Sequence, residues 1–244
     1  MNKWAVIGAA VAGTLVLSSL LVVGGDRLKH SDPDAVSSMA GTPWQIEALP
    51  GGRSRILGPA GLVLGGQAGD QPAAGLLADV RRLWPDTTQI AIVAAPGENG
   101  TLEAFVDPVT LGFVTGKLVV SLALPEDQIR TMRERSPKAE FMESTTRKYT
   151  LAPDDLQQAL AAPISAVTLI PQAQLDEETV VQRFGSPAER VAGAAGVTHL
   201  LYPERGLDVA IHAEGKDLLQ YVAPAHFERL RAPLHRASAA ASQP

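Results

Sequence analysis

Histidine and acidic residues are the side chains of this 244-residue chain that could bind a metal ion or transfer a proton. Two of the five histidines, His199 and His212, fall on neighbouring expected strands, with Glu204 and Asp208 nearby in the sequence. A protein metal site needs three or four convergent ligands, and no H-E-x-x-H or comparable spacing is present. We therefore expect these histidines to lie half-exposed on strands, and we predict no metal site and no cofactor.

Motifs for nucleophilic catalysis and phosphate binding are also missing. Residues 61–77 pass from an expected strand through glycines to an expected helix, but they lack the Lys-Ser/Thr of a P-loop. Ser186 stands in F-G-S-P at the end of an expected helix, not in G-x-S-x-G. Acidic pairs such as Asp154–Asp155 stand at expected helix starts, where the helix dipole explains them. No catalytic residue is assigned, and the sequence favours a function other than catalysis.

Residues 130–155 combine charges of both signs with aromatic side chains. Within this segment, S-T-T-R-K-Y-T-L alternates polar and apolar residues, which predicts a strand. Arginine and tyrosine are frequent contact residues in protein interfaces. We therefore predict a partner-binding surface formed by Phe141, Arg147, Lys148 and Tyr149; a solvated connector is the alternative. The nearby turn Gly97–Gly100 is interpreted as a hairpin tip, with a binding loop as the alternative.

The elements that would position these residues follow from apolar patterns and turn residues. Strands are expected at residues 44–49, 54–57, 89–94, 101–106, 112–124, 145–151, 166–170, 197–202, 207–212 and 218–222. Helices are expected at residues 72–84, 126–135, 154–161, 177–184 and 225–230. Few long helical crossovers separate successive strands, so we predict an α+β fold with a mainly antiparallel sheet and helices on one face.

The N-terminus predicts a single membrane helix. Residues 4–23 form an uncharged, mostly apolar run, which as a helix spans roughly 30 Å, the hydrocarbon thickness of a bilayer. We predict a retained anchor within residues 1–25, followed by a polar linker at residues 26–41; a cleaved signal sequence is the alternative. A short polar head before a long C-terminal domain is typical of an export signal-anchor. The expected location is the cytoplasmic (inner) membrane, single-pass, with the domain facing the periplasm.

Composition excludes several classes of function. The 21 Lys and Arg residues against 26 Asp and Glu residues give a net charge of −5, which argues against nucleic-acid binding. The absence of cysteine excludes disulfides, thiolate metal sites, a cysteine nucleophile and a lipidated N-terminal cysteine.

An internal repeat is predicted in the exported part. Residues 76–86 resemble residues 177–187, and each stretch is followed by a strand that ends at a proline, Pro108 or Pro203. Further strands follow in both stretches and close at Pro125 and Pro224, each of which begins a helix. We predict a tandem duplication with a first α+β copy at 42–135, a second at 136–231 and a loose tail at 232–244.

The second copy resembles a known family. Its order of helix, F-G-S-P, V-T-H-L-L-Y-P and G-L-D-V-A-I-H is similar to the SmpA/OmlA (BamE-like) small lipoproteins, and the β-lactamase-inhibitor proteins are similar as a tandem version. The resemblance covers about 50 residues and implies a non-catalytic, protein-binding envelope module. The sequence departs from the family pattern because it lacks the lipidated cysteine.

These observations predict a membrane-anchored envelope protein whose extracytoplasmic domain binds a protein partner or supports an assembly without catalysis. The alternative is an envelope hydrolase or a ligand-binding ectodomain with a site between the two copies.

Overall fold

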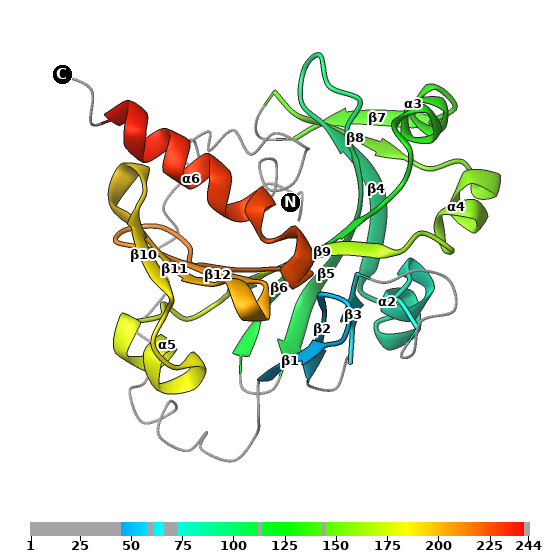
Figure 1. The fold of residues 1–244 in the computed structure, drawn as a ribbon. Helices are drawn as coiled ribbons and strands as arrows, with labels where there is room; N and C mark the ends of the chain where they lie inside the picture. Colours follow the sequence, from blue (N-terminus) through cyan, green and yellow to red (C-terminus); the bar gives the residue numbers. More distant parts are fainter. Residues whose placement is uncertain (1–44, 58–60, 66–72, 112–113, 143–144, 242–244) are drawn as a thin grey trace.

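A computed structural model describes residues 45–57, 61–65, 73–111, 114–142 and 145–241. The described residues form a mixed α+β fold with a large antiparallel sheet and few helices, as the sequence predicted (Figure 1). The predicted membrane segment 4–23 and the linker 26–41 lie outside the described residues. Within the described ranges, no helix is both long and apolar enough to cross a bilayer.

Ten strands form the main sheet, and every pairing in it is antiparallel. In spatial order they are β10 (Glu189–Ala192), β11 (Val197–Tyr202), β12 (Leu207–His212), β13 (Leu218–Val222), β9 (Ile164–Pro171), β6 (Val114–Leu122), β5 (Thr101–Leu111), β4 (Thr88–Ala94), β8 (Arg147–Thr150) and β7 (Lys138–Phe141). A second, three-stranded sheet contains β1 (Gln45–Leu49), β2 (Arg53–Leu57) and β3 (Val63–Leu64).

Five α-helices are described: α2 (Leu77–Leu83), α3 (Glu126–Glu134), α4 (Pro153–Ala159), α5 (Glu177–Phe184) and α6 (Glu228–Ala241). Local sequence explains where they begin. Asp176 caps α5 by accepting a hydrogen bond from the Thr179 amide at 2.7 Å. Pro153 occupies the first turn of α4, where its missing N–H leaves no intrahelical bond unmade.

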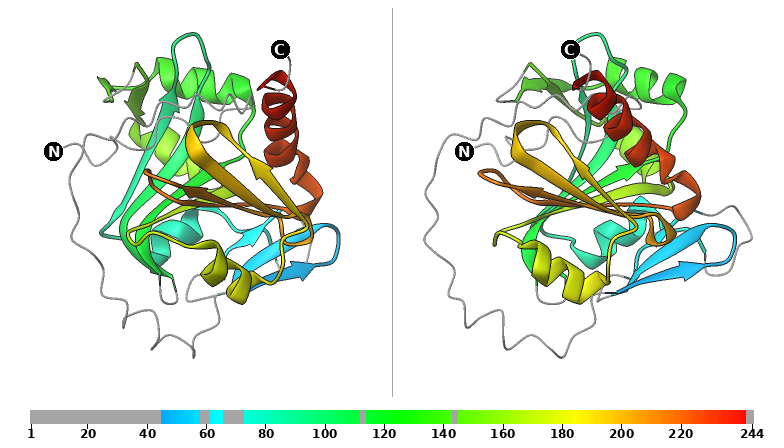
Figure 2. Two further views of the ribbon diagram at one scale, coloured as in Figure 1. Left: turned by 90° about the vertical axis from the view of Figure 1, so that its left-hand side faces the viewer. Right: turned by 60° about the vertical axis from the view of Figure 1, so that its left-hand side comes forward.

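The two faces of the main sheet carry separate apolar clusters because side chains alternate along each strand. On β11, Leu200 belongs to the large cluster, whereas its neighbour Leu201 packs with Leu230 and Leu234 of α6 on the opposite face. Helices α2 to α5 contribute to the large cluster. The views in Figures 1 and 2 place α5 and α6 on opposite sides of strands β10–β13. The prediction that the helices lie on one face is therefore wrong for α6.

The C-terminal segment is more regular than expected. Residues 232–241, predicted to be a loose tail, continue helix α6. Pro233 disfavours a helix locally, whereas the alanines of this stretch favour one. Leu230 and Leu234 lie one turn apart and are both buried, and their packing on the sheet offsets the cost of the proline.

The main sheet is arranged about β9, which pairs with β6 on one side and β13 on the other. In chain order, one half has α2, strands β4 to β6 and then α3. The other half has α5, strands β10 to β13 and then α6. The boundary predicted at residue 135 differs from the spatial division, because β7 and β8 pair next to β4. The sheet passes from one half to the other without a break, so the two halves share one core.

Candidate functional site

The β7–β8 hairpin ends the main sheet and carries all four residues predicted to bind a partner. Strand β8 pairs with β4 on one side and with β7 on the other, whereas β7 is the terminal strand. The sequence predicted β8 within residues 145–151 but missed β7. Its four residues, KAEF, give no apolar run long enough to indicate a strand, and none of them is buried.

The register of this hairpin separates the predicted residues onto two faces. Arg147 lies opposite Phe141, Lys148 opposite Glu140, and Tyr149 opposite Ala139. Successive side chains point to opposite faces of a sheet. Phe141, Arg147 and Tyr149 therefore share one face, and Lys148 lies on the other.

Phe141 is the central feature of the shared face. Its side chain is 61% exposed, and among the described residues it is the only large hydrophobic side chain that is exposed to this degree. The Arg147 guanidinium carbon lies 4.3 Å from the centroid of the Phe141 ring, a cation–π contact. No carboxylate in the described part of the chain pairs with Arg147, so its charge is available to a partner.

Helix α3 adds a second arginine to this face. The guanidinium carbon of Arg133 lies 5.9 Å from the centroid of the Tyr149 ring. Its Nη1 donates hydrogen bonds to the carbonyl oxygens of Glu98 and of Asn99, the latter at 3.2 Å. These two residues belong to the turn that joins β4 to β5, so the prediction of a hairpin tip at Gly97–Gly100 is confirmed. Arg133 thus connects the turn to β8.

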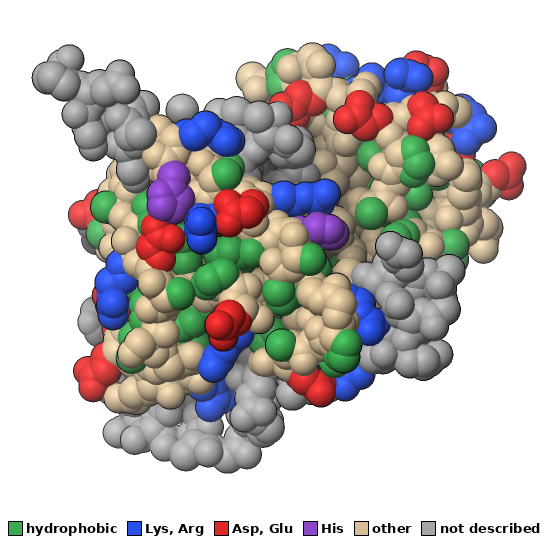
Figure 3. Space-filling model, viewed as in Figure 1, with side chains coloured by type: hydrophobic (Ala, Val, Ile, Leu, Met, Phe, Trp, Pro, Cys, Tyr) green, Lys and Arg blue, Asp and Glu red, His purple; other side chains and the backbone are tan. Residues whose placement is uncertain are grey.

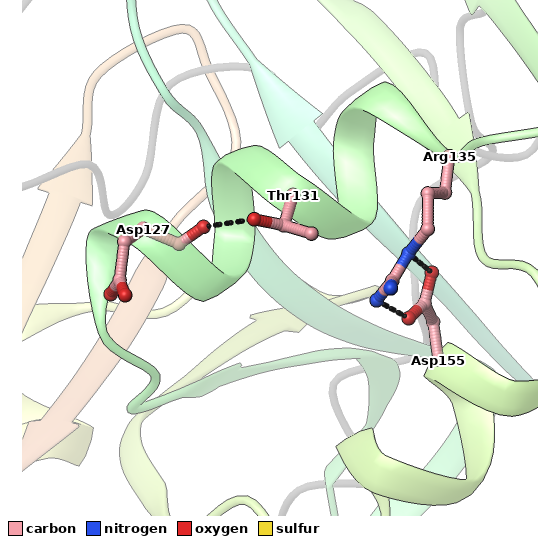
Figure 4. Close-up of polar contacts among 4 residues, drawn as sticks. All are labelled: Asp127, Thr131, Arg135 and Asp155. Atoms are coloured by element: carbon pink, nitrogen blue, oxygen red, sulfur yellow. Dashed lines mark hydrogen bonds and ion pairs between the residues drawn. The ribbon is translucent and has the colours of Figure 1, made fainter.

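The end of α3 is fixed by an ion pair with α4 (Figure 4). Arg135 binds the Asp155 carboxylate through both Nε, at 3.2 Å, and Nη2. The Asp155 side chain is only 3% exposed. Within α3, the Thr131 hydroxyl donates to the Asp127 carbonyl oxygen at 2.8 Å. Because Arg135 follows Arg133 by two residues, this ion pair holds the part of the helix that positions Arg133.

Together these elements enclose a depression of 620 Å³. The turn contributes one wall and the hairpin the other, with Arg133 between them. The lining comprises residues 94–99, Arg133, Phe141, Thr145, Arg147 and Tyr149. We call these residues the hairpin surface. The sequence predicted Phe141, Arg147 and Tyr149 as contact residues, but Arg133 was not singled out, although it lies in the same segment 130–155.

Lys148 does not belong to the hairpin surface. Its Nζ lies 3.5 Å from the Glu140 carboxylate, which Lys138 also approaches at 2.9 Å. The hydrogen bond from Lys138, followed by the charges of both lysines, lowers the pKa of Glu140 below its usual value. The structure therefore places Lys148 in an ion-pair group on the opposite face from Phe141.

On its outer edge, β7 pairs with no other strand among the described residues. The Met142 amide donates a hydrogen bond to the Thr146 carbonyl at 2.9 Å. In an antiparallel pair only every second residue bonds to the neighbouring strand, so the backbone groups of Met142, Glu140 and Lys138 face β8. Ala139 and Phe141 consequently direct their N–H and C=O groups away from the sheet. Such an edge can accept another extended segment as an additional strand.

The other candidate residues form structural contacts. His199 Nδ1 lies 2.9 Å from Asp208 Oδ2, and both side chains are almost fully buried. His199 is therefore more buried than we predicted. His212 lies on the adjacent strand, but the described residues contain no group of three or more His, Cys, Asp or Glu side chains arranged to hold a metal ion.

Asp176, at the start of α5, acts as a helix cap, as expected. Asp155, in the first turn of α4, instead forms a buried ion pair with Arg135, which the sequence did not predict. Ser186 directly follows Gly185, which ends α5 with φ of 79°.

Comparisons with known proteins give no relative. No family model matches the chain, no curated protein matches it, and no solved structure matches it.

Proposed function

We propose that this protein is a membrane-anchored envelope protein whose extracytoplasmic domain binds another protein through the hairpin surface and performs no catalysis. The observation that carries the proposal is the exposed Phe141 ring, held by Arg147 beside an open strand edge. Aromatic residues, including Phe, and arginine are enriched in protein interfaces relative to the rest of the surface.

The chemistry of the hairpin surface specifies the partner. The free backbone groups of Ala139 and Phe141 match an extended segment that adds a strand to β7. Arg147 matches a carboxylate on that segment, and the rings of Phe141 and Tyr149 match an apolar side chain. The proposed partner therefore presents an extended segment with an acidic and an apolar residue two positions apart, so that both side chains lie on the same face of the added strand.

A defined peptide tests this recognition. An octapeptide with Val and Asp in turn at every second position and Thr between them (T-V-T-D-T-V-T-D) should bind the folded domain saturably, whereas the same peptide with Lys in place of Asp should not. The double variant Phe141→Ala/Arg147→Ala should lose at least about tenfold in affinity, equivalent to about 1.4 kcal/mol. Two controls should keep the wild-type affinity: Arg81→Ala on α2, and Lys148→Met on the opposite face of β8.

Quantitative pull-downs from detergent-solubilised membranes extend the test to the native partner. The wild-type chain should enrich a protein that the Phe141→Ala/Arg147→Ala variant does not enrich and that Arg81→Ala retains. Equal enrichment by all three chains, or equal binding of the two octapeptides, contradicts the proposal.

Membrane attachment by residues 4–23 is tested separately. The full chain should stay in the membrane pellet after alkaline extraction, and a chain starting at residue 26 should become extractable. Because the protein has no cysteine, Glu98→Cys in the exposed β4–β5 turn gives a single labelling site. A membrane-impermeant maleimide should label it from the periplasmic side. Labelling only after lysis contradicts the proposed orientation.

A further inference from the structure

A second cavity lies between α6 and the face of the main sheet that α6 covers. Its volume is 630 Å³, within the range of about 300–1,000 Å³ typical of small-molecule sites. Residues from both halves of the sheet line it, including Thr101 and Leu122 from one half and Gln220 and Leu230 from the other. The cavity is separate from the hairpin surface and shares no lining residue with it.

Two polar side chains without hydrogen-bond partners form part of its floor. Thr168 on β9 and Gln220 on β13 lie directly opposite each other in the strand register. They are only 2% and 9% exposed, respectively. Within the described chain, neither side chain makes a hydrogen bond. Both side chains line the cavity, so their polar groups are available to hydrogen-bond a ligand there.

Helix α6 supplies two arginines to the rim. Arg229 and Arg236 are seven residues apart, two turns along one side of the helix, and both line the cavity. Neither forms an ion pair with a described carboxylate. Figure 3 shows basic, acidic and histidine side chains together along this helix.

The two acidic residues that line the cavity have partners of their own. Glu228 lies 3.3 Å from Arg231, which does not line the cavity. Glu126 accepts a hydrogen bond from the Asn99 side chain at 3.3 Å. Asn99 is neutral, so Glu126 keeps its negative charge, and apart from the paired Glu228 the lining carries two positive charges and one negative charge.

The remaining wall is mainly apolar and includes Leu122, Leu124, Ile129, Val222 and Leu230. An apolar wall favours a hydrocarbon body, two unpaired arginines favour an anion, and the Thr168–Gln220 pair favours a further hydrogen-bonding group. We propose that this cavity binds an amphipathic carboxylate with an apolar body and a second polar group. Arg229 and Arg236 bind the carboxylate, and Gln220 and Thr168 bind the second group.

Three probes separate the contributions. 10-Hydroxydecanoate carries both polar groups, decanoate lacks the hydroxyl, and 1,10-decanediol lacks the charge. By calorimetry below micellar concentration, 10-hydroxydecanoate should bind the wild-type protein most tightly. The variant Arg229→Ala/Arg236→Ala should weaken its binding at least about tenfold and leave the diol unaffected. Arg81→Ala should change nothing.

Gln220→Leu tests the floor with an apolar residue of similar size. This variant should discriminate less between 10-hydroxydecanoate and decanoate than the wild-type protein does, because only Thr168 remains to bind the hydroxyl group. Three outcomes overturn the proposal: no saturable binding of 10-hydroxydecanoate, equal binding of all three probes by the wild-type protein, or unchanged binding by the double arginine variant.

Discussion

Arg147 stacks over Phe141 across the β7–β8 register, with its guanidinium carbon 4.3 Å from the ring centroid. The contact covers one face of an aromatic ring that is still 61% exposed. An exposed cation–π pair contributes only about 0.5–1 kcal/mol to stability. The pair therefore orients two side chains for contact with a partner and adds little to the folded state.

Phe141→Ala should consequently leave the fold almost unchanged. We expect the free energy of unfolding in urea to fall by less than about 1 kcal/mol, because the ring buries little surface. Phe105→Ala is the matched comparison, since that ring on β5 is fully buried. It should cost about 3–5 kcal/mol. A large loss of stability in Phe141→Ala would assign the ring a structural role.

The ion pair between Arg135 and Asp155 should contribute strongly to stability. Removing the arginine leaves a carboxylate that is only 3% exposed without its charged partner. Breaking a fully buried pair costs about 3–5 kcal/mol, and the half-exposed Arg135 reduces our expectation to about 2–3 kcal/mol for Arg135→Ala. Urea unfolding measures the difference.

An exposed ion pair provides the control for Arg135. Arg82 lies 2.9 Å from Asp79, and the arginine side chain is 76% exposed. Arg82→Ala should change the free energy of unfolding by less than about 0.5 kcal/mol. If Arg135→Ala and Arg82→Ala lower the free energy of unfolding equally, the burial of Asp155 does not strengthen its ion pair.

Gly206 occupies a position that other residues cannot occupy without rearrangement. Its φ is +66°, and an added Cβ would lie 1.9 Å from the Val222 carbonyl oxygen. Gly206→Ala should therefore cost at least about 3 kcal/mol. Gly97→Ala is the control, because φ is +83° there but nothing lies within 4 Å of the added Cβ. Left-handed strain alone should cost about 1–2 kcal/mol, and similar losses in both variants would exclude the predicted clash.

The parts of the fold with strong local signals could be predicted from the sequence. Helix α5 and strands β11, β12 and β13 have the predicted bounds. The Asp176 cap and the glycine at residue 185 limit the helix, and Gly206 separates two of the strands. In contrast, β7 and β10 are only four residues long, and half of these residues are charged, so the two strands form because a neighbouring strand pairs with them.

The candidate site depends on contacts between distant segments, which the sequence does not specify. Arg133 bonds to Asn99, 34 residues earlier, and stacks on Tyr149. The separation of Lys148 from its two neighbours follows from strand alternation, once the register of β8 is known. The proposed duplication stays a prediction. The similar order of elements on both sides of β9 supports it.

Glu103 should make stability depend on pH. It lies on β5 opposite Ser121 and Ala91, is 4% exposed, and its Oε2 has no hydrogen-bond partner among the described residues. Burial raises the pKa of this carboxyl from 4.5 to about 8. Between these pH values the folded chain keeps a proton that the unfolded chain has lost. The free energy of unfolding should therefore decrease as pH rises from 4.5 to 8, by at most about 1.4 kcal/mol per pH unit for this group.

Glu103→Gln removes this titration while keeping a side chain of similar shape. The variant should gain stability relative to wild type as pH rises, and by pH 8 the difference should have grown by several kcal/mol. Urea unfolding at pH 5, 6, 7 and 8 measures it. Other groups, including Asp217 and His212, titrate in both proteins and cancel in the difference. For the exposed control Glu98→Gln, the free energy of unfolding should change with pH in the same way as for wild type. A Glu103→Gln curve that also runs parallel to that of wild type would show that Glu103 is ionised in the folded protein.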